Sequence, residues 1–203
     1  MNLSKTSTQY NSKIHPKKFA LLLGLGSVVM MFAGLTSAFL VRRAAGNWVE
    51  YKIPELFLLS TIVIIVSSIV IQLAYTALKK QKYNYYKLGL GATLILGIIF
   101  CVLQYFGWQE LTNIGIRLTG NPSGSFLYVI SGIHVMHVLG GMVFLLAMFL
   151  ISLKKLSPAN ILIRETNLDE KERYLGIELM MTYWHFIGIL WIYLYLFFSY
   201  YAV

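Results

Sequence analysis

Apolar residues gather in five long runs along the chain, and short polar segments separate these runs. Each run is near or above the roughly 20 residues that an α-helix needs to cross the hydrocarbon core of a bilayer. Only helices and closed barrels satisfy the backbone in lipid, and uninterrupted apolar runs of this length are not barrel strands. The pattern predicts an all-α integral membrane protein whose residues 19–203 form one five-helix bundle, with spans at 19–41, 56–78, 88–106, 126–153 and 175–203.

Composition supports a membrane protein and excludes a water-soluble enzyme. Of the 203 residues, 58% are hydrophobic and 12% are charged, whereas a soluble domain carries about 25% charged residues. The single cysteine, Cys101, lies inside an apolar run, so the chain has neither an internal disulfide nor a thiolate metal cluster. The net charge of +9 does not indicate nucleic-acid binding, because the basic residues cluster at the ends of the apolar runs.

The distribution of Lys and Arg predicts the orientation of the bundle. Four lie in residues 1–18, four between the second and third spans and five in residues 154–174, against three and one in the two other connections. Because basic loops stay in the cytoplasm, the N-terminus is expected inside and the C-terminus outside. Residues 1–18 are polar for too long to resemble a secretory signal and are expected to form a cytoplasmic tail. Residues 157–173 are expected to form a solvated cytoplasmic loop with room for one helical turn.

Four ionisable side chains lie within the predicted spans. His134 and His137 share one stripe of the fourth span, and Glu178 and His185, seven residues apart, share a face of the fifth. Because such groups are costly in lipid, they should face the bundle interior and satisfy one another. Helices that run antiparallel bring the two stripes to similar depth. The pattern therefore predicts a buried polar cluster in which Glu178 contacts a histidine of the fourth span, His137 rather than His134.

Three hypotheses account for this cluster. The imidazoles could bind copper, zinc or a haem iron. Glu178 and a histidine could form a proton relay, as buried carboxylates and imidazoles do in pumps. The simplest interpretation is an interhelical hydrogen-bond network that fixes the register of the helices and needs no cofactor. The many aromatic residues from Tyr183 onward suit packing and an interfacial belt, with a quinone or ring site as an alternative.

The chain shows no catalytic pattern of its own. It has no phosphate-binding glycine loop, no nucleophile elbow and no pair of carboxylates within one span. Small residues recur at four-residue spacing, a pattern that lets helices approach closely in lipid; they include Gly89, Thr93 and Gly97, and also Gly34 and Ala38. Gly132 and Gly140 extend the pattern with Met136 between them. If the protein belongs to an enzyme, the chemistry is expected on another chain.

Several sequence strings together resemble subunit III of haem-copper oxidases, in its bacterial five-helix form. Residues 121–128 are Asn-Pro-Ser-Gly-Ser-Phe-Leu-Tyr, and residues 132–141 are Gly-Ile-His-Val-Met-His-Val-Leu-Gly-Gly. Residues 175–178, Leu-Gly-Ile-Glu, are followed by Tyr-Trp-His-Phe at 183–186. Residues 27–34 look like the opening helix of that family, and the resemblance covers nearly the whole chain.

The resemblance implies a multi-pass, non-catalytic subunit of an aa3-type, proton-pumping cytochrome c oxidase in the bacterial inner membrane. Such a subunit has no haem or copper of its own and packs against the catalytic subunit I, which holds these metals, and against subunit II. It stabilises the complex during turnover, encloses phospholipid between its first two helices and the other three, and can join a larger respiratory supercomplex. Candidate residues for the lipid head groups are Arg42, Arg43, Lys79 and Lys80.

Two departures from the family pattern leave alternatives open. Val28 stands where the family usually has a buried glutamate, and Gly188 stands where it usually has an aspartate. The proton-uptake role of that glutamate therefore does not carry over. Subunit III of a quinol oxidase and the related accessory protein of nitric oxide reductase remain alternatives. A small proton-coupled transporter using Glu178 and the histidines is a further one, although the inverted repeats common in transporters are not visible.

Overall fold

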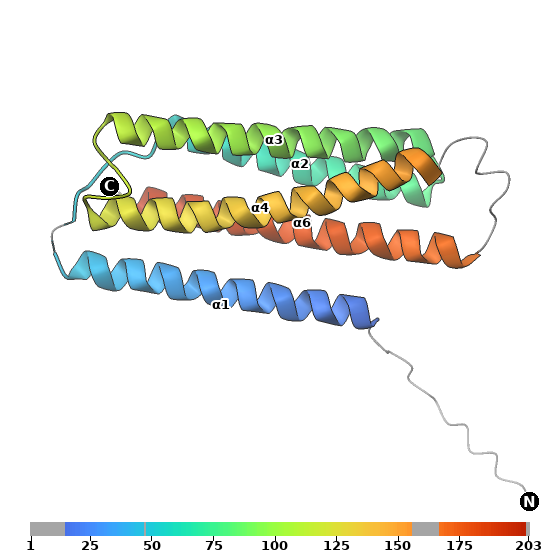
Figure 1. Ribbon diagram of the computed structural model, residues 1–203, viewed down its shortest axis with the longest axis horizontal. Helices are drawn as coiled ribbons and strands as arrows, with labels where there is room; N and C mark the ends of the chain where they lie inside the picture. The colour runs from blue at the N-terminus through green and yellow to red at the C-terminus, as the bar shows by residue number, and fades with distance from the viewer. Residues whose placement is uncertain (1–14, 47, 156–166, 202–203) are drawn as a thin grey trace, which may run out of the picture.

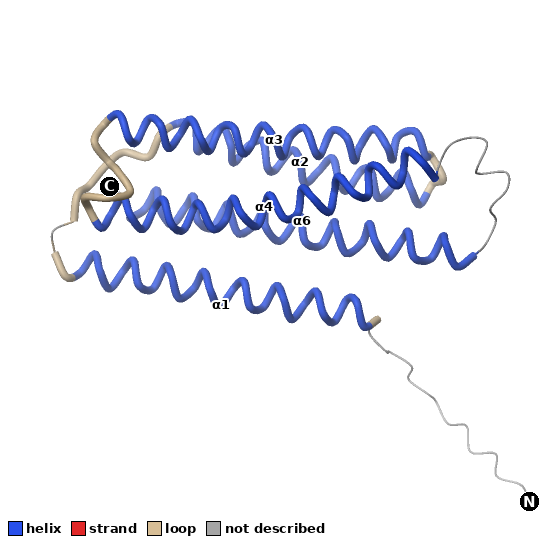
Figure 2. Tube along the Cα trace, viewed as in Figure 1, coloured by secondary structure: helices blue, strands red, loops and turns tan. Residues whose placement is uncertain are grey.

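The computed structural model describes residues 15–46, 48–155 and 167–201, and side chains within them except at 155 and 167–173. These residues form five α-helices (Figure 1): α1 (Pro16–Ala44), α2 (Glu55–Lys79), α3 (Tyr83–Asn113), α4 (Pro122–Lys155) and α6 (Asn167–Tyr201). The described part of the chain contains no strand (Figure 2). All five helices are long and apolar enough to cross a membrane, which confirms the predicted number of spans.

The helices extend beyond the apolar runs, mainly at the N-terminal ends. Helix α1 begins at Pro16, where proline is tolerated because the first helical N–H groups have no partner within the helix. Lys17 and Lys18 therefore belong to α1 and not to the predicted tail, whose residues 1–14 lie outside the described residues. Helix α6 begins at Asn167, so the predicted loop is wrong from that residue onward. Its charged run is made of good helix formers that continue the span; residues 156–166 are not described.

Consecutive helices run antiparallel, and the start of α1 and the end of α6 lie at opposite ends of the bundle (Figure 1). Helix α2 packs most extensively on α3 and also on α6, while α4 packs on α3 and α6. Helix α1 lies at the edge, against α4 and α6. The predicted division into helices one and two against the other three is therefore wrong. Side-chain packing places α2 with α3 and α6, and it leaves α1 on the opposite side of the bundle.

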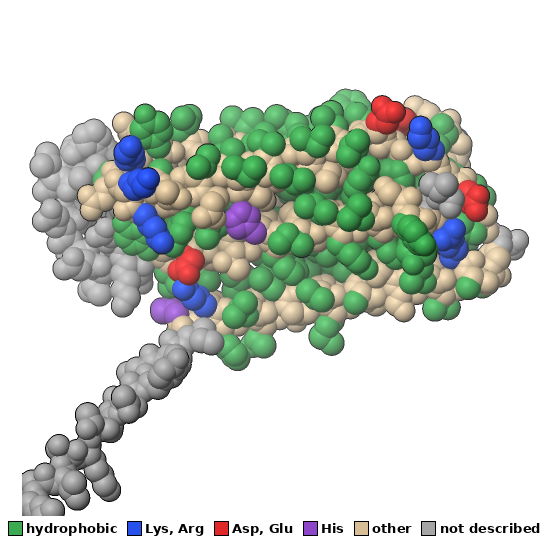
Figure 3. Space-filling model, turned by 180° about the vertical axis from the view of Figure 1, so that it is seen from behind, with side chains coloured by type: hydrophobic (Ala, Val, Ile, Leu, Met, Phe, Trp, Pro, Cys, Tyr) green, Lys and Arg blue, Asp and Glu red, His purple; other side chains and the backbone are tan. Residues whose placement is uncertain are grey.

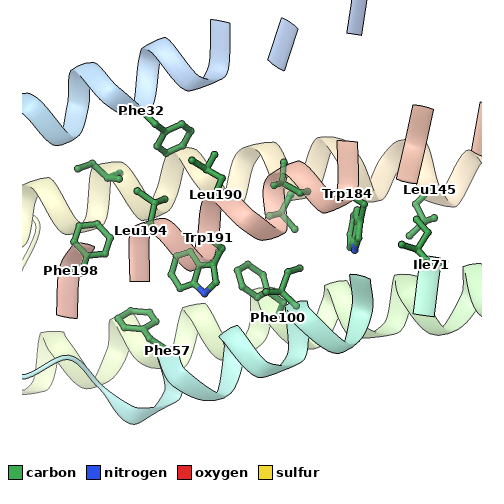
Figure 4. Packing of buried hydrophobic residues seen from close by; sticks show 14 of the residues in the cluster. Phe32, Phe57, Ile71, Phe100, Leu145, Trp184, Leu190, Trp191, Leu194 and Phe198 are labelled. Atoms are coloured by element: carbon green, nitrogen blue, oxygen red, sulfur yellow. The ribbon is translucent and has the colours of Figure 1, made fainter. Parts of the chain in front are cut away.

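Two tryptophans of α6 dominate the core (Figure 4). Trp184 and Trp191 lie seven residues apart on one face of α6 and are fully buried. The Trp191 ring meets Phe57 of α2 and Phe100 of α3 edge-on, at centroid distances of 5.9 and 5.4 Å. Trp184 packs on Gly97 of α3, where a β-carbon would come within 3.1 Å of the indole. Large rings on α6 are thus accommodated by small residues on its neighbours.

Asn121 and Ser123, which belong to the string at residues 121–128, anchor the connections at the end of the bundle where α6 ends. Asn121 caps α4, since its Oδ1 accepts hydrogen bonds from the Ser123 N–H at 2.9 Å and from the Ser123 hydroxyl at 2.7 Å. Tyr51, in the α1–α2 connection, donates to the Ser123 carbonyl at 3.5 Å. Burial raises the pKa of the Tyr51 hydroxyl, and the nearby Tyr128 adds to this shift. These contacts fix the start of α4, the helix that carries His134 and His137.

The outer surface has the pattern of a membrane protein. In Figure 3 the charged side chains gather near the two ends of the bundle, and hydrophobic side chains cover much of the face between them. Many large apolar residues are exposed along the helices, such as Met30, Ile69 and Val143. A soluble monomer rarely exposes so much contiguous apolar surface, whereas lipid or a partner covers it in a membrane.

Candidate functional site

His134 lies at the centre of the bundle in an aromatic cage. Its side chain is fully buried, and its ring lies 5.2 Å from the Trp191 ring and about 6 Å from the rings of Phe32 and Phe100, centroid to centroid. Neither ring nitrogen has a hydrogen-bond partner among the described residues. Val28, one helical turn before Phe32 on α1, offers no polar atom to this region. The expected hydrogen-bond network therefore does not include His134.

His137, one turn further along α4, is half-buried and bonds within its own helix. Its Nδ1 donates to the carbonyl of Ile133 at 2.8 Å. The link to α6 goes through the backbone, because the Tyr183 hydroxyl donates to the His137 carbonyl at 2.9 Å. The ring meets Phe32 of α1 edge-on, 5.9 Å between centroids. His137 thus contributes to helix packing more than to a polar network.

Glu178 pairs with a lysine, and the prediction of a contact with a histidine is wrong. Its Oε1 accepts a hydrogen bond from Lys18 Nζ at 2.6 Å, which joins α6 to α1. Both side chains are more than a third exposed, 37% for Glu178 and 38% for Lys18. The physical reason is the early start of α1, which brings Lys18 to the level of Glu178. An ammonium group satisfies the carboxylate by full charge neutralisation, so no imidazole is needed.

His185 lies on a different face of the bundle, between α6 and α2. Its Nε2 donates to Gln72 Oε1 at 3.3 Å. Together with Ser68, the two residues line a mainly apolar groove of about 350 Å³ on the outer surface. Gly188 lies in the same groove, and a β-carbon at this position would come 3.2 Å from the Ser68 hydroxyl oxygen. The glycine at position 188 therefore lets α6 approach α2 closely.

The four predicted residues thus do not form one polar cluster: His134 and His137 both pack on the Phe32 ring, whereas Glu178 and His185 each meet another helix. No hydrogen bond between described side chains connects His134, His137, Glu178 and His185 to one another. Within the described residues, no three His, Cys, Asp or Glu side chains lie close enough together to hold a metal ion. Spacing along a helix did not determine which neighbouring helix each side chain meets, because Glu178 bonds to α1 and His185 bonds to α2.

Three buried hydrogen bonds, whose pairs of residues sequence reasoning did not identify, join α2 to its neighbours. The Trp184 indole donates to Ser67 Oγ at 2.9 Å, and the Trp191 indole donates to Thr61 Oγ1 at 3.0 Å. Gln104 of α3 donates to Ser60 Oγ at 2.9 Å. A signal was present, because the hydroxyl residues of α2 and the tryptophans of α6 both recur near seven-residue spacing. Indole and hydroxyl groups, not ionised ones, link the helices in the core.

The four side chains predicted to bind lipid head groups differ in what they contact. Arg42 donates from Nη1 to the Gly46 carbonyl at 3.2 Å, and the Arg43 guanidinium lies 5.4 Å from the Tyr201 ring centroid. Lys79 lies over the Tyr75 ring, 4.5 Å from its centroid. Lys80 instead lines a groove of about 450 Å³ between α2 and α3, together with Lys82. Of the four, Lys80 faces a space that a ligand could occupy.

Comparison with known proteins identifies the family. Residues 14–203 match the model of the family described as cytochrome c oxidase subunit III. The chain belongs to this family. With five membrane-length helices, it is a helical membrane protein of the cytochrome c oxidase subunit III family, as the sequence strings predicted. The strings at 121–128, 132–141 and 175–186 all lie within the matched region.

Relatives of the chain include bacterial and animal proteins. It is 29% identical over 189 residues to cytochrome c oxidase subunit 3 of Synechocystis sp., which covers 90% of this chain and 75% of the relative. It is 27% identical to the Corynebacterium diphtheriae protein of that name, covering 83% and 80%. The match to the Anopheles quadrimaculatus protein is 31% identical and covers 72% of this chain. The matched part spans about half the length of that insect relative, 49%.

Proposed function

We propose that this chain is subunit III of an aa3-type cytochrome c oxidase in the inner membrane of a bacterium. It carries no catalytic residues; the haem and copper lie on the catalytic subunit I, beside which it packs, with subunit II nearby. The complex reduces oxygen and pumps protons as part of the respiratory chain, and it can join a larger supercomplex. The observation that carries the proposal is the family match over residues 14–203, combined with five membrane-length helices.

The environments of the polar residues within the spans support a structural role. The Glu178 carboxylate is paired with Lys18, and the N–H groups of Trp184 and Trp191 are paired with hydroxyls of α2. His134 packs among aromatic rings without a polar contact among described residues. A proton relay needs groups that exchange protons along connected hydrogen bonds. The contacts found here suit a rigid bundle that supports a catalytic neighbour.

The outer surface supports contact with another membrane chain. Gln72 and His185 lie in a groove at the surface, although exposed polar groups at this depth in lipid are costly. On α1, a β-carbon at Gly24, Gly26 or Gly34 would meet nothing within 4 Å. Helix faces with small residues are those on which membrane helices associate. We propose that subunit I covers part of this surface, with the N-terminus of the chain inside and its C-terminus outside, as the basic residues favour.

Copurification tests the proposal. The full chain, tagged after Val203 and extracted from its own membrane in mild detergent, should retain a haem- and copper-bearing partner at a one-to-one ratio, with cytochrome c oxidase activity. Quinol oxidation or nitric oxide reduction by the retained partner would move the chain to the corresponding related complex. Retention of no haem protein under conditions that preserve the five-helix fold would contradict the proposal.

Removal of the chain tests its role. Deleting it should leave the haem spectrum of the catalytic subunit nearly unchanged, because no metal ligand is lost. The oxidase should then inactivate sooner during sustained turnover. Loss of a haem or copper signal in proportion to loss of the chain would contradict a supporting role.

A further inference from the structure

A narrow groove runs along the α2–α3 hairpin from the connecting turn toward the middle of the bundle. It has a volume of about 450 Å³ and is lined along its length by apolar side chains, among them Leu73, Ala77, Leu88 and Ala92. Its mouth, next to the turn, is lined by Lys80, Lys82 and Tyr85. The groove therefore has one apolar end and one cationic end.

The turn between the helices places both lysines at the mouth. Lys80 follows the last residue of α2, Lys82 precedes α3, and Gln81 between them has a φ of 55°, an uncommon left-handed conformation for a residue with a side chain. The N–H groups of Gln81 and Lys82 satisfy the last carbonyls of α2, at 2.9 Å each to Leu78 and Ala77. The carbonyls at the end of α2 therefore need no lysine side chain as a partner.

The two ammonium groups are not neutralised within the described part of the chain. Lys80 and Lys82 have no carboxylate partner there; Lys82 lies 5.9 Å from the centroid of the Tyr85 ring. The adjacent Lys79 differs, because it is engaged by Tyr75 at 4.5 Å. Two positive charges at one mouth repel each other and attract a shared anion. The mouth thus has the charge to bind a phosphate group.

The close contact of α2 and α3 at the floor makes the groove shallow, which suits a hydrocarbon chain better than a helix. At its floor α2 and α3 are in contact, since a β-carbon at Gly89 would lie 2.7 Å from the β-carbon of Ala74. The groove is therefore about one side chain deep, whereas a helix with its side chains is about 10 Å across. The mouth lies at the end of a membrane span, where lipid head groups meet the hydrocarbon region.

We propose that the α2–α3 groove binds one anionic phospholipid, with its phosphate between Lys80 and Lys82 and an acyl chain along the groove. This inference rests on the proposed function in one respect, namely that the chain lies in a bacterial membrane, and it names a lipid site and the head-group charge. It replaces the predicted cleft between the first two helices and the other three. It also adds Lys82, which the sequence did not single out, to the candidate Lys80.

Native mass spectrometry of the full chain, purified from its membrane, tests the charge at the mouth. Phosphatidylglycerol should bind more tightly than phosphatidylcholine with the same acyl chains. Because one lysine near an anionic lipid contributes about fivefold in affinity, the double variant Lys80→Gln/Lys82→Gln should bind phosphatidylglycerol about thirtyfold more weakly. Lys79→Gln is the matched control and should change the affinity less than about twofold. Equal binding of the two lipids, or equal effects of the control and the double variant, would overturn the proposal.

A second variant tests the apolar part of the groove without changing its charge. Ala77→Phe should fill the groove and weaken phosphatidylglycerol binding about tenfold or more, while Ile98→Phe, at an exposed position elsewhere on α3, should not. Equal effects of these two variants would also overturn the proposal. The outcome is separate from that of copurification, because lipid binding is measured on the chain itself. A chain that binds phosphatidylglycerol as expected but retains no haem protein would contradict the proposed function alone.

Discussion

Helices α1 and α3 look alike in sequence but occupy different positions in the bundle. Both are long, apolar and rich in glycine, yet 17% of the most apolar stretch of α1 is buried against 33% of that of α3. On α3, β-carbons at Gly97 and Gly107 would come within 3.1 Å of Trp184 and 2.8 Å of Phe57. On α1, a β-carbon at Gly34 would meet nothing within 4 Å.

The difference shows that a small-residue stripe in a membrane helix indicates close packing without identifying the partner. The stripe of α3 is used inside the chain, because aromatic side chains of α2 and α6 fill the space that glycine leaves. The face of α1 that carries Gly34 is left uncovered by the chain. Helix α1 is held by Phe39, whose buried ring contacts rings of α4 and α6, and by Lys18 near the other end.

The largest effect is expected from glycines that pack on a neighbouring backbone. Gly89→Leu should lower the free energy of unfolding in detergent by about 3 kcal/mol, because its β-carbon would collide with Ala74 of α2. Gly34→Leu on α1 is the matched substitution and should change the free energy of unfolding of the isolated chain by less than about 0.5 kcal/mol. Titration with a denaturing detergent measures both. Similar losses would show that the two glycine faces do not differ.

Gly89→Leu and Gly34→Leu also distinguish a helix face that packs within the chain from one that packs on a partner chain. If subunit I covers α1, Gly34→Leu should reduce copurification of the haem protein although the isolated chain keeps its stability. Gly89→Leu should reduce both together. Unchanged copurification with Gly34→Leu would mean that this face of α1 lies in lipid.

A smaller loss of stability is expected when the Ser67 hydroxyl, which accepts the hydrogen bond of the buried Trp184 indole, is removed. Ser67→Ala should lower the free energy of unfolding by about 1–2 kcal/mol, because the Trp184 N–H loses its acceptor in a water-free core. Ser27→Ala on α1 is the control and should have almost no effect, since Ser27 bonds only to the Leu23 carbonyl of its own helix. Ser67→Ala should cost less in a Trp184→Phe background, where no indole N–H needs an acceptor. An equal cost in the two backgrounds would assign the loss to packing alone.

The sequence was sufficient for the five helices because each apolar run carries its own signal. Whether a stretch of about 20 residues spans a membrane depends on its own length and apolar composition. Neighbouring helices do not change the number of such stretches. Helix ends were less certain: Lys18 and the charged run before Tyr174 look polar, yet both continue a helix. The partners of polar groups depend on how each helix is rotated. A shift of a few residues at the start of α1 was enough to exchange the expected partner of Glu178, a histidine, for Lys18.

Substitution of His134 should show that its side chain contributes by packing on aromatic rings and not by hydrogen bonding. His134→Leu should raise the free energy of unfolding by about 1 kcal/mol, because two buried nitrogens without partners are replaced by an apolar side chain of similar size. His137→Leu is the control and should give no gain, since its Nδ1 is already bonded to Ile133. Circular dichroism at increasing temperature measures both. A loss of more than about 1 kcal/mol for His134→Leu would show that the imidazole has a polar partner in the native membrane.

The smallest effect is expected at the ion pair that holds the first turn of α1 on α6. Lys18 and Glu178 are each more than a third exposed, so solvent screens their attraction, and exposed pairs of this kind contribute about 0.2–1 kcal/mol. Glu178→Gln and Lys18→Gln should therefore each cost less than about 1 kcal/mol. The expected global stability of either variant is close to that of the unchanged chain, and the local effect should appear as faster protease cleavage near the start of α1.

A double-mutant cycle distinguishes this pair from the histidine contact that the sequence first suggested. The free energies for Glu178→Gln and Lys18→Gln should be non-additive, with a coupling of up to about 1 kcal/mol that decreases as salt is raised. Glu178→Gln and His137→Leu should be additive, because Glu178 is bonded to Lys18 and His137 to its own helix. Coupling of Glu178 to His137 instead of Lys18 would mean that α1 begins later in the membrane than Pro16. Helix α1 would then be attached to the bundle through its aromatic contacts alone.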